Sequence, residues 1–388
     1  MTRSALFVVY ATVFLDLLGF GILLPALPYY AKQLGAHGTT LGILFSAYSV
    51  AQMIGSNLLG RVSDRVGRRP VLLVSLAGSA ISMTLSGFAR SLLQLGAARS
   101  VAGLAGGSIS TAQAYIADST RPEERAPYMG MLGASIGLGF VAGPVLGALL
   151  IARGHGFAGA AFTSAGLAAA NWLLALFTLK ESPHRVAGAG HRGLGAWLAA
   201  FSRPSLPPLL LAGFFTMLAF VGMETTFAFW VDSRFGIKEK GLGLLLGYLG
   251  VVMILVQGGM IRPLTRRFGV QPVAFAGALL LAASLASLPF SPTLGVAMAV
   301  MAFLAAGQGL ANPSLATLLS QAASADEQGT VLGAGQSSAA LARAVGPLLA
   351  GTLYDLGQGW PYWAAALLAV VAATLVKRTR PVEQAVPG

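Results

Sequence analysis

Four ionisable residues lie inside long apolar stretches, where a charge is costly: Asp16, Arg99, Glu224 and Arg343. An ionised side chain at the centre of a bilayer costs at least about 2.5–3.5 kcal/mol on insertion scales, so such a residue usually marks a functional site or faces water. Burial and a nearby cation act in opposite directions on the proton affinity of a carboxyl group. Asp16 and Glu224 are therefore candidates for proton binding, with Arg99 near Asp16 or Arg343 near Glu224. Alternatively, each is part of a static buried ion pair that fixes helix packing.

Aromatic and amide side chains could complete a binding cavity. Phe220 and Phe227 share a helical face with Glu224, at i−4 and i+3, and Trp230 lies further along. Cations are attracted to aromatic faces and to an acid, although packing or lipid contact explains these aromatics almost as well. Four amides could orient a substrate or bridge helices: Gln308 and Asn312, four residues apart, with Gln113 and Gln336 as further candidates.

The composition indicates a membrane protein. The chain has 388 residues, of which 55% are hydrophobic and only 10% charged. A transmembrane helix needs about 20 predominantly apolar residues. Twelve such stretches are present, at roughly 5–30, 40–59, 70–89, 92–117, 127–151, 157–179, 206–231, 241–261, 270–289, 292–320, 329–353 and 359–376. We therefore expect an all-α polytopic membrane protein with twelve transmembrane helices.

The chain also repeats itself. A polar interruption predicts an N-terminal six-helix bundle at 1–180, a cytoplasmic central loop at 181–205 and a C-terminal six-helix bundle at 206–388. The loop 64–70 recurs in degraded form at 266–272, and Gly143-Pro144 recurs as Gly346-Pro347. Duplication of this kind is typical of transporters whose substrate site lies between the halves.

The net charge of +12 is concentrated in alternate loops. Lysine and arginine accumulate on the cytoplasmic side of membrane proteins. This distribution predicts that both termini are cytoplasmic and that the basic residues report topology rather than nucleic-acid binding. The composition and short loops are typical of a bacterial inner-membrane protein.

Several motifs resemble those of the major facilitator superfamily. The segment 60–69, Gly-Arg-Val-Ser-Asp-Arg-Val-Gly-Arg-Arg, fits the G-x-x-x-D-[RK]-x-G-[RK]-[RK] loop between helices 2 and 3 of that family. The segments 99–103 and 139–147 resemble its helix 4 and helix 5 "antiporter" motifs. Asp16-Leu17-Leu18-Gly19, with Pro25 and Pro28, is similar to the helix 1 motif of the twelve-helix drug:proton antiporters, whose branches include tetracycline efflux proteins.

The resemblance implies that the loop 60–70 is a gate. A positive-inside signal explains its arginines but not Asp64 or Gly67 at this spacing. Asp64 could accept from the N-terminal end of a facing helix, and Arg68 could pair with Asp118, holding the cytoplasmic side closed. The expected gating residues are Gly60, Asp64, Arg65, Gly67, Arg68, Arg69 and Asp118. In the second copy Arg266 stands where Asp64 does, so the latch is asymmetric.

Three glycines in the helix 5 motif recur every four residues. Gly139, Gly143 and Gly147 therefore share one face, and Pro144 adds a bend and a freed carbonyl. Small residues at this spacing allow close helix packing. We expect a tight, kinked interface, with Gly346 and Pro347 as its symmetric counterpart.

The expected function is proton-coupled export of small amphipathic or cationic compounds by alternating access, as in multidrug or tetracycline efflux. Alternatives are transport of a metabolite such as a sugar, amino acid or lipid, and a non-transporting receptor or scaffold. An enzyme is not expected, because neither a histidine cluster nor a nucleophile elbow is evident. No cofactor, metal or nucleic acid is expected: cysteine is absent and no phosphate-binding loop is present. The expected partners are a small-molecule substrate, protons and the lipid bilayer, with the chain acting as a monomer.

Overall fold

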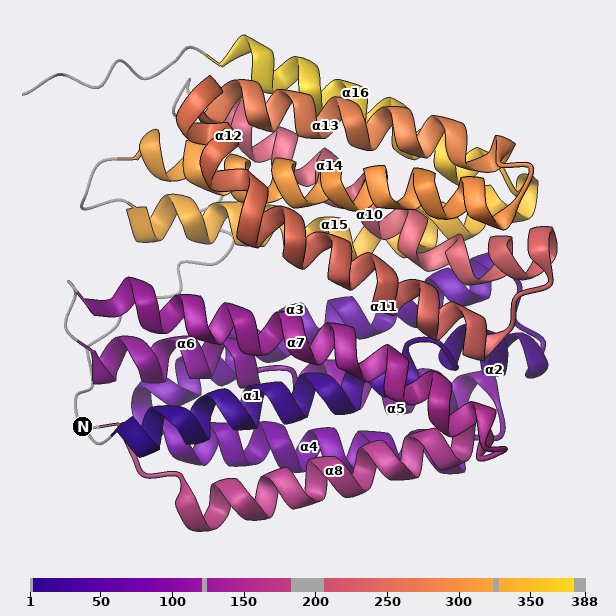
Figure 1. Ribbon diagram of the computed structural model, residues 1–388. Coiled ribbons are helices and arrows are strands. Elements are labelled where there is room, and N and C mark those ends of the chain that lie inside the picture. Colours follow the sequence, from indigo (N-terminus) through magenta and orange to yellow (C-terminus); the bar gives the residue numbers. More distant parts are fainter. Residues whose placement is uncertain (1–2, 121–123, 183–205, 324–327, 380–388) are drawn as a thin grey trace, which may run out of the picture. The chain divides into compact units, whose positions relative to one another are not determined.

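A computed structural model describes residues 3–120, 124–182, 206–323 and 328–379 (Figure 1). Within these ranges the chain is helical and contains no strand. The first half comprises α1 (Arg3–Leu23), α2 (Leu27–Gln33), α3 (Gly38–Val66), α4 (Arg68–Phe88), α5 (Leu92–Leu104), α6 (Ser108–Ser119), α7 (Arg125–Ala152) and α8 (Gly156–Thr178). The second comprises α10 (Leu206–Phe235), α11 (Glu239–Leu255), α12 (Ile261–Phe268), α13 (Val270–Ser287), α14 (Leu294–Gln321), α15 (Gln328–Leu356) and α16 (Trp360–Arg378). Most of the predicted central loop, at 183–205, lies outside the described residues.

The chain forms two compact units. One contains Met1–His191 and Phe227–Gly250, and the other contains Arg192–Thr226 and Val251–Gly388. Both α10 and α11 contribute residues to each unit. The domain boundaries inferred from the sequence, at 180 and 206, remain a prediction.

The twelve predicted stretches all coincide with described helices. In the described part, nine helical segments are long and apolar enough to span a membrane. The three other predicted stretches correspond to α3, the pair α5–α6, and α15, which carry more polar residues. In the part of the chain that the structure describes, the protein is thus polytopic and all-α, with helices at each of the twelve expected places.

Three of the predicted helices are interrupted. The first breaks between α1 and α2, around Pro25, which lacks a backbone N–H. The fourth breaks at residues 105–107, where two glycines separate α5 from α6. The eighth contains a π-helical turn at Val256–Met260 between α11 and α12. Such turns leave backbone groups unpaired and often occur near functional sites.

Each unit has its own apolar core. In the first unit, buried residues of α1, α4, α6, α7 and α8 surround Tyr115, which is fully buried. In the second unit, the core joins α10, α13, α14, α15 and α16 around Leu206 and Leu315. The helix α4 packs against α8 and α5, and α13 packs against α16 and α14 in the corresponding way. The sequence repeat is therefore also a repeat of helix packing.

Candidate functional site

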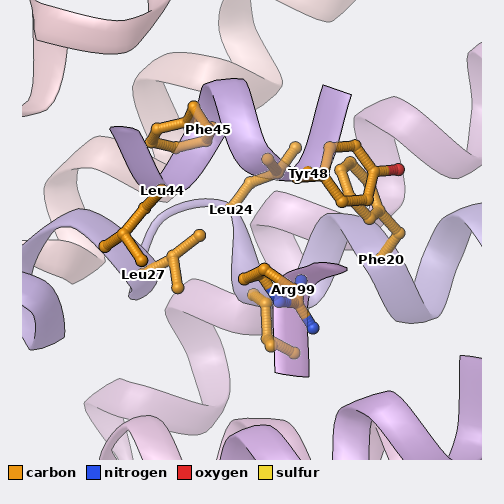
Figure 2. Close-up of a pocket in the computed structure, with 8 residues that line it drawn as sticks. Phe20, Leu24, Leu27, Leu44, Phe45, Tyr48 and Arg99 are labelled. Carbon is orange, nitrogen blue, oxygen red and sulfur yellow. The ribbon is translucent and has the colours of Figure 1, made fainter. Parts of the chain in front are cut away.

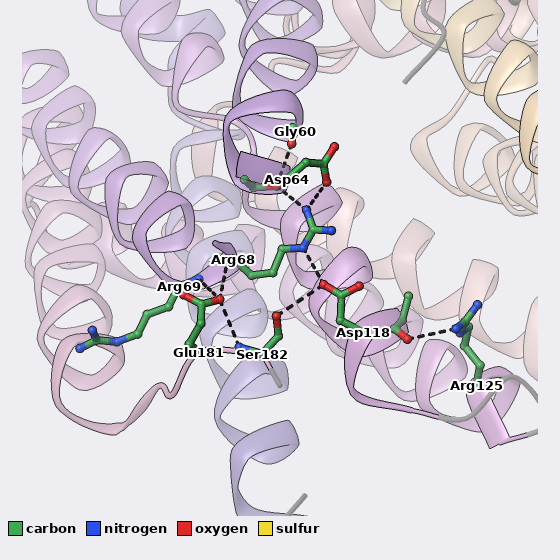
Figure 3. Close-up of polar contacts among 10 residues, drawn as sticks. Gly60, Asp64, Arg68, Arg69, Asp118, Arg125, Glu181 and Ser182 are labelled. Atoms are coloured by element: carbon green, nitrogen blue, oxygen red, sulfur yellow. Dashed lines mark hydrogen bonds and ion pairs between the residues drawn. The ribbon is translucent and has the colours of Figure 1, made fainter. Parts of the chain in front are cut away.

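The best-connected polar group in the first unit surrounds Arg68, at the start of α4 (Figure 3). Its guanidinium donates from Nε to Asp118 Oδ2 at 2.8 Å and from Nη1 to Ser63 Oγ at 2.7 Å. Nη1 also contacts Asp64 Oδ1 at 2.5 Å, four residues earlier. The Asp118 side chain is only 2% exposed. The structure thus brings Arg68 and Asp118 together as a buried ion pair, with Asp64 at its edge.

Glu181 completes this group, and the sequence did not suggest it. It follows α8 closely, and its Oε1 accepts from the backbone N–H groups of Arg68 at 2.7 Å and Arg69 at 3.3 Å. Backbone N–H groups in the first turn of a helix have no partner within the helix itself, so Glu181 supplies one here. The helix dipole also stabilises a carboxylate at this position, typically by about 0.3–1 kcal/mol. The Arg68 cluster is defined here as Ser63, Asp64, Arg68, Asp118, Glu181 and Ser182.

Gly67 is required at this turn for two reasons. Its φ of 111° lies in a region that residues with a side chain rarely adopt. A Cβ at this position would also lie 2.5 Å from Glu181 Oε2. The glycine therefore allows both the turn into α4 and the approach of the capping carboxylate.

The other predicted gating residues have separate contacts. Arg69 Nη2 donates to the backbone oxygen of Leu176 in α8 at 2.7 Å. Gly60 accepts from Ser63 Oγ through its backbone oxygen at 2.8 Å. For Asp64, the described partner is Arg68, and its contact with the N-terminal end of a facing helix remains a prediction. The gating role of the loop also remains a prediction.

The helix 5 glycines pack against α1 along one face. A Cβ on Gly139 would lie 2.8 Å from Leu17 Cβ, and one on Gly143 would lie 2.6 Å from Gly21 Cα. A Cβ on Gly147 would lie 2.2 Å from the backbone oxygen of Ile22. Helices α1 and α7 are thus in direct backbone contact. Pro144 lies inside the same helix.

The counterpart in the second unit is less tight. A Cβ on Gly346 of α15 would meet Leu218 Cδ1 of α10 at 3.1 Å. Pro347 again lies inside the helix. Gly346 thus faces α10 as Gly143 faces α1. The neighbour of Gly346 is a flexible leucine side chain, whereas the neighbour of Gly143 is the backbone of Gly21.

Asp16 lies in α1 and accepts a hydrogen bond of 2.6 Å from Ser108 Oγ. Ser108 is the first residue of α6, directly after the break in the fourth predicted helix. The break therefore positions a hydroxyl opposite a carboxylate inside a membrane-spanning segment. The sequence signal for this contact was weak, since serine is common in helices of this type.

Arg99 does not pair with Asp16, which corrects one expectation. Its Nη2 donates to Ser86 Oγ at 3.0 Å and lies 3.4 Å from both Ser82 Oγ and Met83 Sδ. These three residues are on α4, so Arg99 joins α5 to α4 instead of reaching Asp16 on α1. The reason is local: Ser82 and Ser86 are one turn apart and present two hydroxyls on one face.

In the second unit, Glu224 is an exposed residue of α10 between buried Met223 and Thr225. Arg343 of α15 is close enough to act electrostatically on its carboxylate. The predicted charge neighbour of Glu224 is thus present.

The predicted aromatic group divides along α10. Phe227 and Trp230 are each 2% exposed and stack with ring centroids 6.1 Å apart. Phe220 is half-buried. The burial of Phe227 and Trp230 is typical of aromatic residues that serve packing. Glu224, which lies between Phe220 and Phe227 in the sequence, is exposed.

The four predicted amides differ in environment. Gln308 of α14 is 3% exposed, and its Oε1 has no hydrogen-bond partner. Asn312, one turn further on, is exposed, as are Gln113 of α6 and Gln336 of α15. A buried amide oxygen without a hydrogen-bond partner lowers the stability of the fold. Among the four amides, Gln308 is therefore the strongest candidate for a hydrogen bond to a ligand or a water molecule.

A second charged cluster, also unforeseen, surrounds Asp232 near the end of α10. Asp232 accepts from Lys32 Nζ of α2 at 2.8 Å and from Lys238 Nζ at 2.6 Å. Tyr29 Oη donates to the backbone oxygen of Ile237 at 2.7 Å. The hydrogen bond to Asp232 raises the pKa of Lys238 above its usual value. Since the folded pKa of Lys238 is the higher one, the contribution of this interaction to stability is fully present below about pH 10.4 wherever Asp232 is ionised, and it is lost as the pH rises through the folded pKa.

The chain matches the family profile of the Major Facilitator Superfamily over residues 9–347 and again over 260–388. The chain belongs to the major facilitator superfamily. The second match begins inside the repeat and reaches the end of the chain, in agreement with the duplicated helix packing. As a member of this superfamily, the chain is a multi-pass membrane transporter, and the described helices α1–α8 and α10–α16 belong to the fold of that superfamily.

Its relatives in the superfamily include named resistance proteins. It is 34% identical to tetracycline resistance protein, class C, of Escherichia coli over 373 residues, 91% of this chain and 90% of that protein. It is 27% identical to multidrug resistance protein 2 of Bacillus subtilis (strain 168), covering 96% of this chain and 94% of the relative. The crystal structure of the human organic anion transporter MFSD10 (TETRAN) is similar, with a TM-score of 0.72 at 27% identity, covering 96% of this chain and 99% of that one.

Proposed function

We propose that this transporter is a proton-coupled antiporter that exports small amphipathic or cationic compounds, of the kind handled in drug efflux and antibiotic resistance. The proposal is supported by its likeness to tetracycline and multidrug resistance proteins. No bound cofactor takes part, and the proton gradient supplies the driving force. The chain works as a monomer in a bacterial inner membrane with both termini cytoplasmic, binds no nucleic acid and catalyses no reaction.

One observation carries the coupling mechanism. Asp16 lies in a membrane-spanning helix, where its carboxylate accepts from the hydroxyl of Ser108 at 2.6 Å and also interacts with the hydroxyl of Ser79. A hydroxyl both donates and accepts, so Ser108 can remain bonded to Asp16 whether or not the carboxyl carries a proton. An arginine partner would instead favour the ionised form. Asp16 is therefore suited to exchange its proton for a substrate cation.

Glu224 is the second proton-binding candidate, and its environment differs. Arg343 acts on its carboxylate and favours the ionised form relative to a site without a cation. Glu224 therefore serves mainly to attract a cationic substrate, and Asp16 carries the proton.

The test is proton release by purified protein in detergent when a cationic substrate such as ethidium is added, followed by ethidium–proton exchange in liposomes. Asp16→Asn should abolish release and reduce exchange by at least about 100-fold, since general acid–base groups contribute about 10²–10⁴-fold to proton transfer. Ser108→Ala keeps the acid and should reduce exchange less.

The matched control is Asp355→Asn, which removes an exposed carboxylate near the end of α15. It should behave as the unmodified chain does. Full proton-coupled exchange by Asp16→Asn would refute the assignment of that residue. Exchange of a sugar, amino acid or lipid, with none of ethidium, would favour the metabolite alternative. The absence of any substrate-dependent flux would favour a receptor or scaffold.

A further inference from the structure

Arg99 is a buried cation whose described partners carry no negative charge. The residue is 3% exposed. Its Nη2 contacts the hydroxyls of Ser82 and Ser86 and the sulfur of Met83, and its Nε has no hydrogen-bond partner. A buried charge without a counter-ion costs several kcal/mol, and hydroxyl dipoles offset only part of that cost. An anion placed next to this guanidinium would therefore offset part of that cost.

A small cavity lies beside this guanidinium (Figure 2). Its volume is about 20 Å³, and its wall includes Phe20 and Leu24 from the end of α1 and Tyr48 from α3. Arg99 is the charged member of that wall, and the other lining residues are apolar or aromatic. The cavity thus combines one buried cation with apolar surroundings, in which an anion interacts strongly because water does not screen it.

We propose that Arg99 and this cavity form a subsite for the anionic group of a transported compound, a carboxylate-type group on an apolar or aromatic body. The inference rests on the proposed function, because it specifies an anionic group on the amphipathic compounds of that proposal, as distinct from the cationic ones. It also assigns Arg99 a role in substrate recognition, where the sequence had suggested a role in proton coupling.

The chemistry of the site favours a carboxylate. An arginine presents several N–H donors in one plane, which match the two oxygens of a carboxylate, and such charge-assisted hydrogen bonds are among the stronger ones. A cavity of about 20 Å³ holds roughly one water-sized group, which suits an anionic headgroup and not a whole organic molecule.

The aromatic wall provides a place for the body of the compound. Phe20 and Tyr48 are half-buried and stack with ring centroids 5.5 Å apart, and Phe140 meets Phe20 edge-on at 6.2 Å. Offset and edge-on arrangements of this kind readily extend to another flat ring. Phe20 also lies one helical turn from Asp16 on the same face of α1, so this subsite adjoins the proposed proton carrier.

A purely structural role for Arg99 is the competing explanation. In that case its hydrogen bonds to Ser82 and Ser86 brace α5 against α4, and no anion binds. The two explanations differ in ligand selectivity, because bracing gives no preference for a carboxylate over a neutral molecule of the same shape.

The test compares the binding of radiolabelled 1-naphthoate and its neutral amide, 1-naphthamide, to the full chain in nanodiscs. The unmodified chain should bind naphthoate at least about 10-fold more tightly, as expected for a hydrogen bond to a charged group. Arg99→Gln should lower naphthoate affinity by at least about 30-fold and remove the preference over the amide. Arg90→Gln, which changes an exposed arginine before α5, should leave both affinities unchanged.

A second variant covers the case in which Arg99→Gln does not fold. Leu24→Phe keeps the arginine and fills the cavity, so it should weaken naphthoate binding by about 10-fold or more while Arg99 remains in place. Equal affinity for the two probes in the unmodified chain, unchanged naphthoate binding by Leu24→Phe, or binding of chloride alone would each overturn the proposal. Loss of this subsite with intact ethidium–proton exchange would leave the proposed function standing.

Discussion

The two copies of the repeated loop make the same turn with different chemistry. Gly67 and Gly269 have φ and ψ of 111° and 163°, and of 86° and 162°, and each leads directly into a long helix. In the first copy, arginines and carboxylates surround the turn. In the second copy, Arg266 replaces Asp64 and Val270 replaces Arg68. The turn therefore does not need the charges in order to form.

Each copy also fastens its helix to the last helix of its half. Arg69 donates to the backbone oxygen of Leu176 in α8 at 2.7 Å. At the equivalent position, Gln271 donates to the backbone oxygens of Val376 at 2.9 Å and Thr379 at 2.6 Å, at the end of α16. In the second half, one uncharged amide thus makes the contact between the two helices. The charges of the first copy are therefore available for another role. We propose that they form an ion pair that breaks and re-forms during transport.

The largest expected effect is on the buried ion pair. Arg68→Val, which copies the second half, leaves Asp118 buried and unpaired, and should lower the free energy of unfolding by about 3–5 kcal/mol. The double variant Arg68→Val/Asp118→Gln also removes the unpaired charge and should recover at least about half of the loss. Thermal unfolding in detergent measures both. A double variant no more stable than the single one would show that the cost does not come from the stranded carboxylate.

The next largest expected effect is a difference in stability between alanine substitutions at the two glycine interfaces, α7 with α1 and α15 with α10. Gly147→Ala would place a Cβ 2.2 Å from the Ile22 backbone oxygen, so it should destabilise the fold by about 3 kcal/mol. Gly346→Ala would place a Cβ 3.1 Å from Leu218 Cδ1 and 3.4 Å from Val221 Cγ1. Both neighbours are side-chain atoms, so the substitution should cost less than about 1 kcal/mol. Gly133→Ala, in the same helix as Gly147 and with no atom within 4 Å, is the control. Similar unfolding temperatures for Gly147→Ala and Gly346→Ala would contradict the difference in packing.

A smaller effect is expected for the amide that fastens α13 to α16. Gln271→Ala removes hydrogen bonds to backbone oxygens at a half-buried site, which should cost about 1 kcal/mol. Arg69→Ala tests the equivalent contact with Leu176 in the first half and should cost a similar amount. Unfolding temperatures of the two variants provide the comparison. A much larger loss for Arg69→Ala would mean that its charge, and not only its hydrogen bond, stabilises the helix pair.

The sequence predicted the helices well because each one must satisfy its own backbone inside a bilayer. All twelve stretches were identified by apolar length alone. The breaks at residues 105–107 and the π-helical turn at 256–260 were missed, since glycine and apolar residues are frequent in intact membrane helices too. Repeat offsets correctly related Gly143 to Gly346, because internal duplication preserves packing.

Side-chain partners were harder to predict. Arg68 and Asp118 were matched because a family motif positions both. Glu181 was missed because it lies 113 residues from Arg68 and caps a helix through its backbone, which leaves no charge pattern in the sequence. Arg99 was expected near Asp16 because both are charged, yet two serines one turn apart on α4 determine its direction. Opposite charge alone cannot identify which helix face a side chain meets.

The most direct test of the central claim is Asp64→Asn, measured for both stability and transport. Asp64 is 26% exposed, lies at the edge of the Arg68 cluster, and has no acidic counterpart in the second half. If the charge serves the transport cycle, the unfolding free energy should change by less than about 1 kcal/mol, because Arg68 keeps its ion pair with Asp118 and the asparagine amide oxygen can still accept its hydrogen bond. Ethidium–proton exchange should fall at least about 10-fold. Arg266→Gln, at the matching position, should change neither. Unimpaired exchange together with a large loss of stability would contradict the account, because it would make the first loop's charges a requirement of the fold.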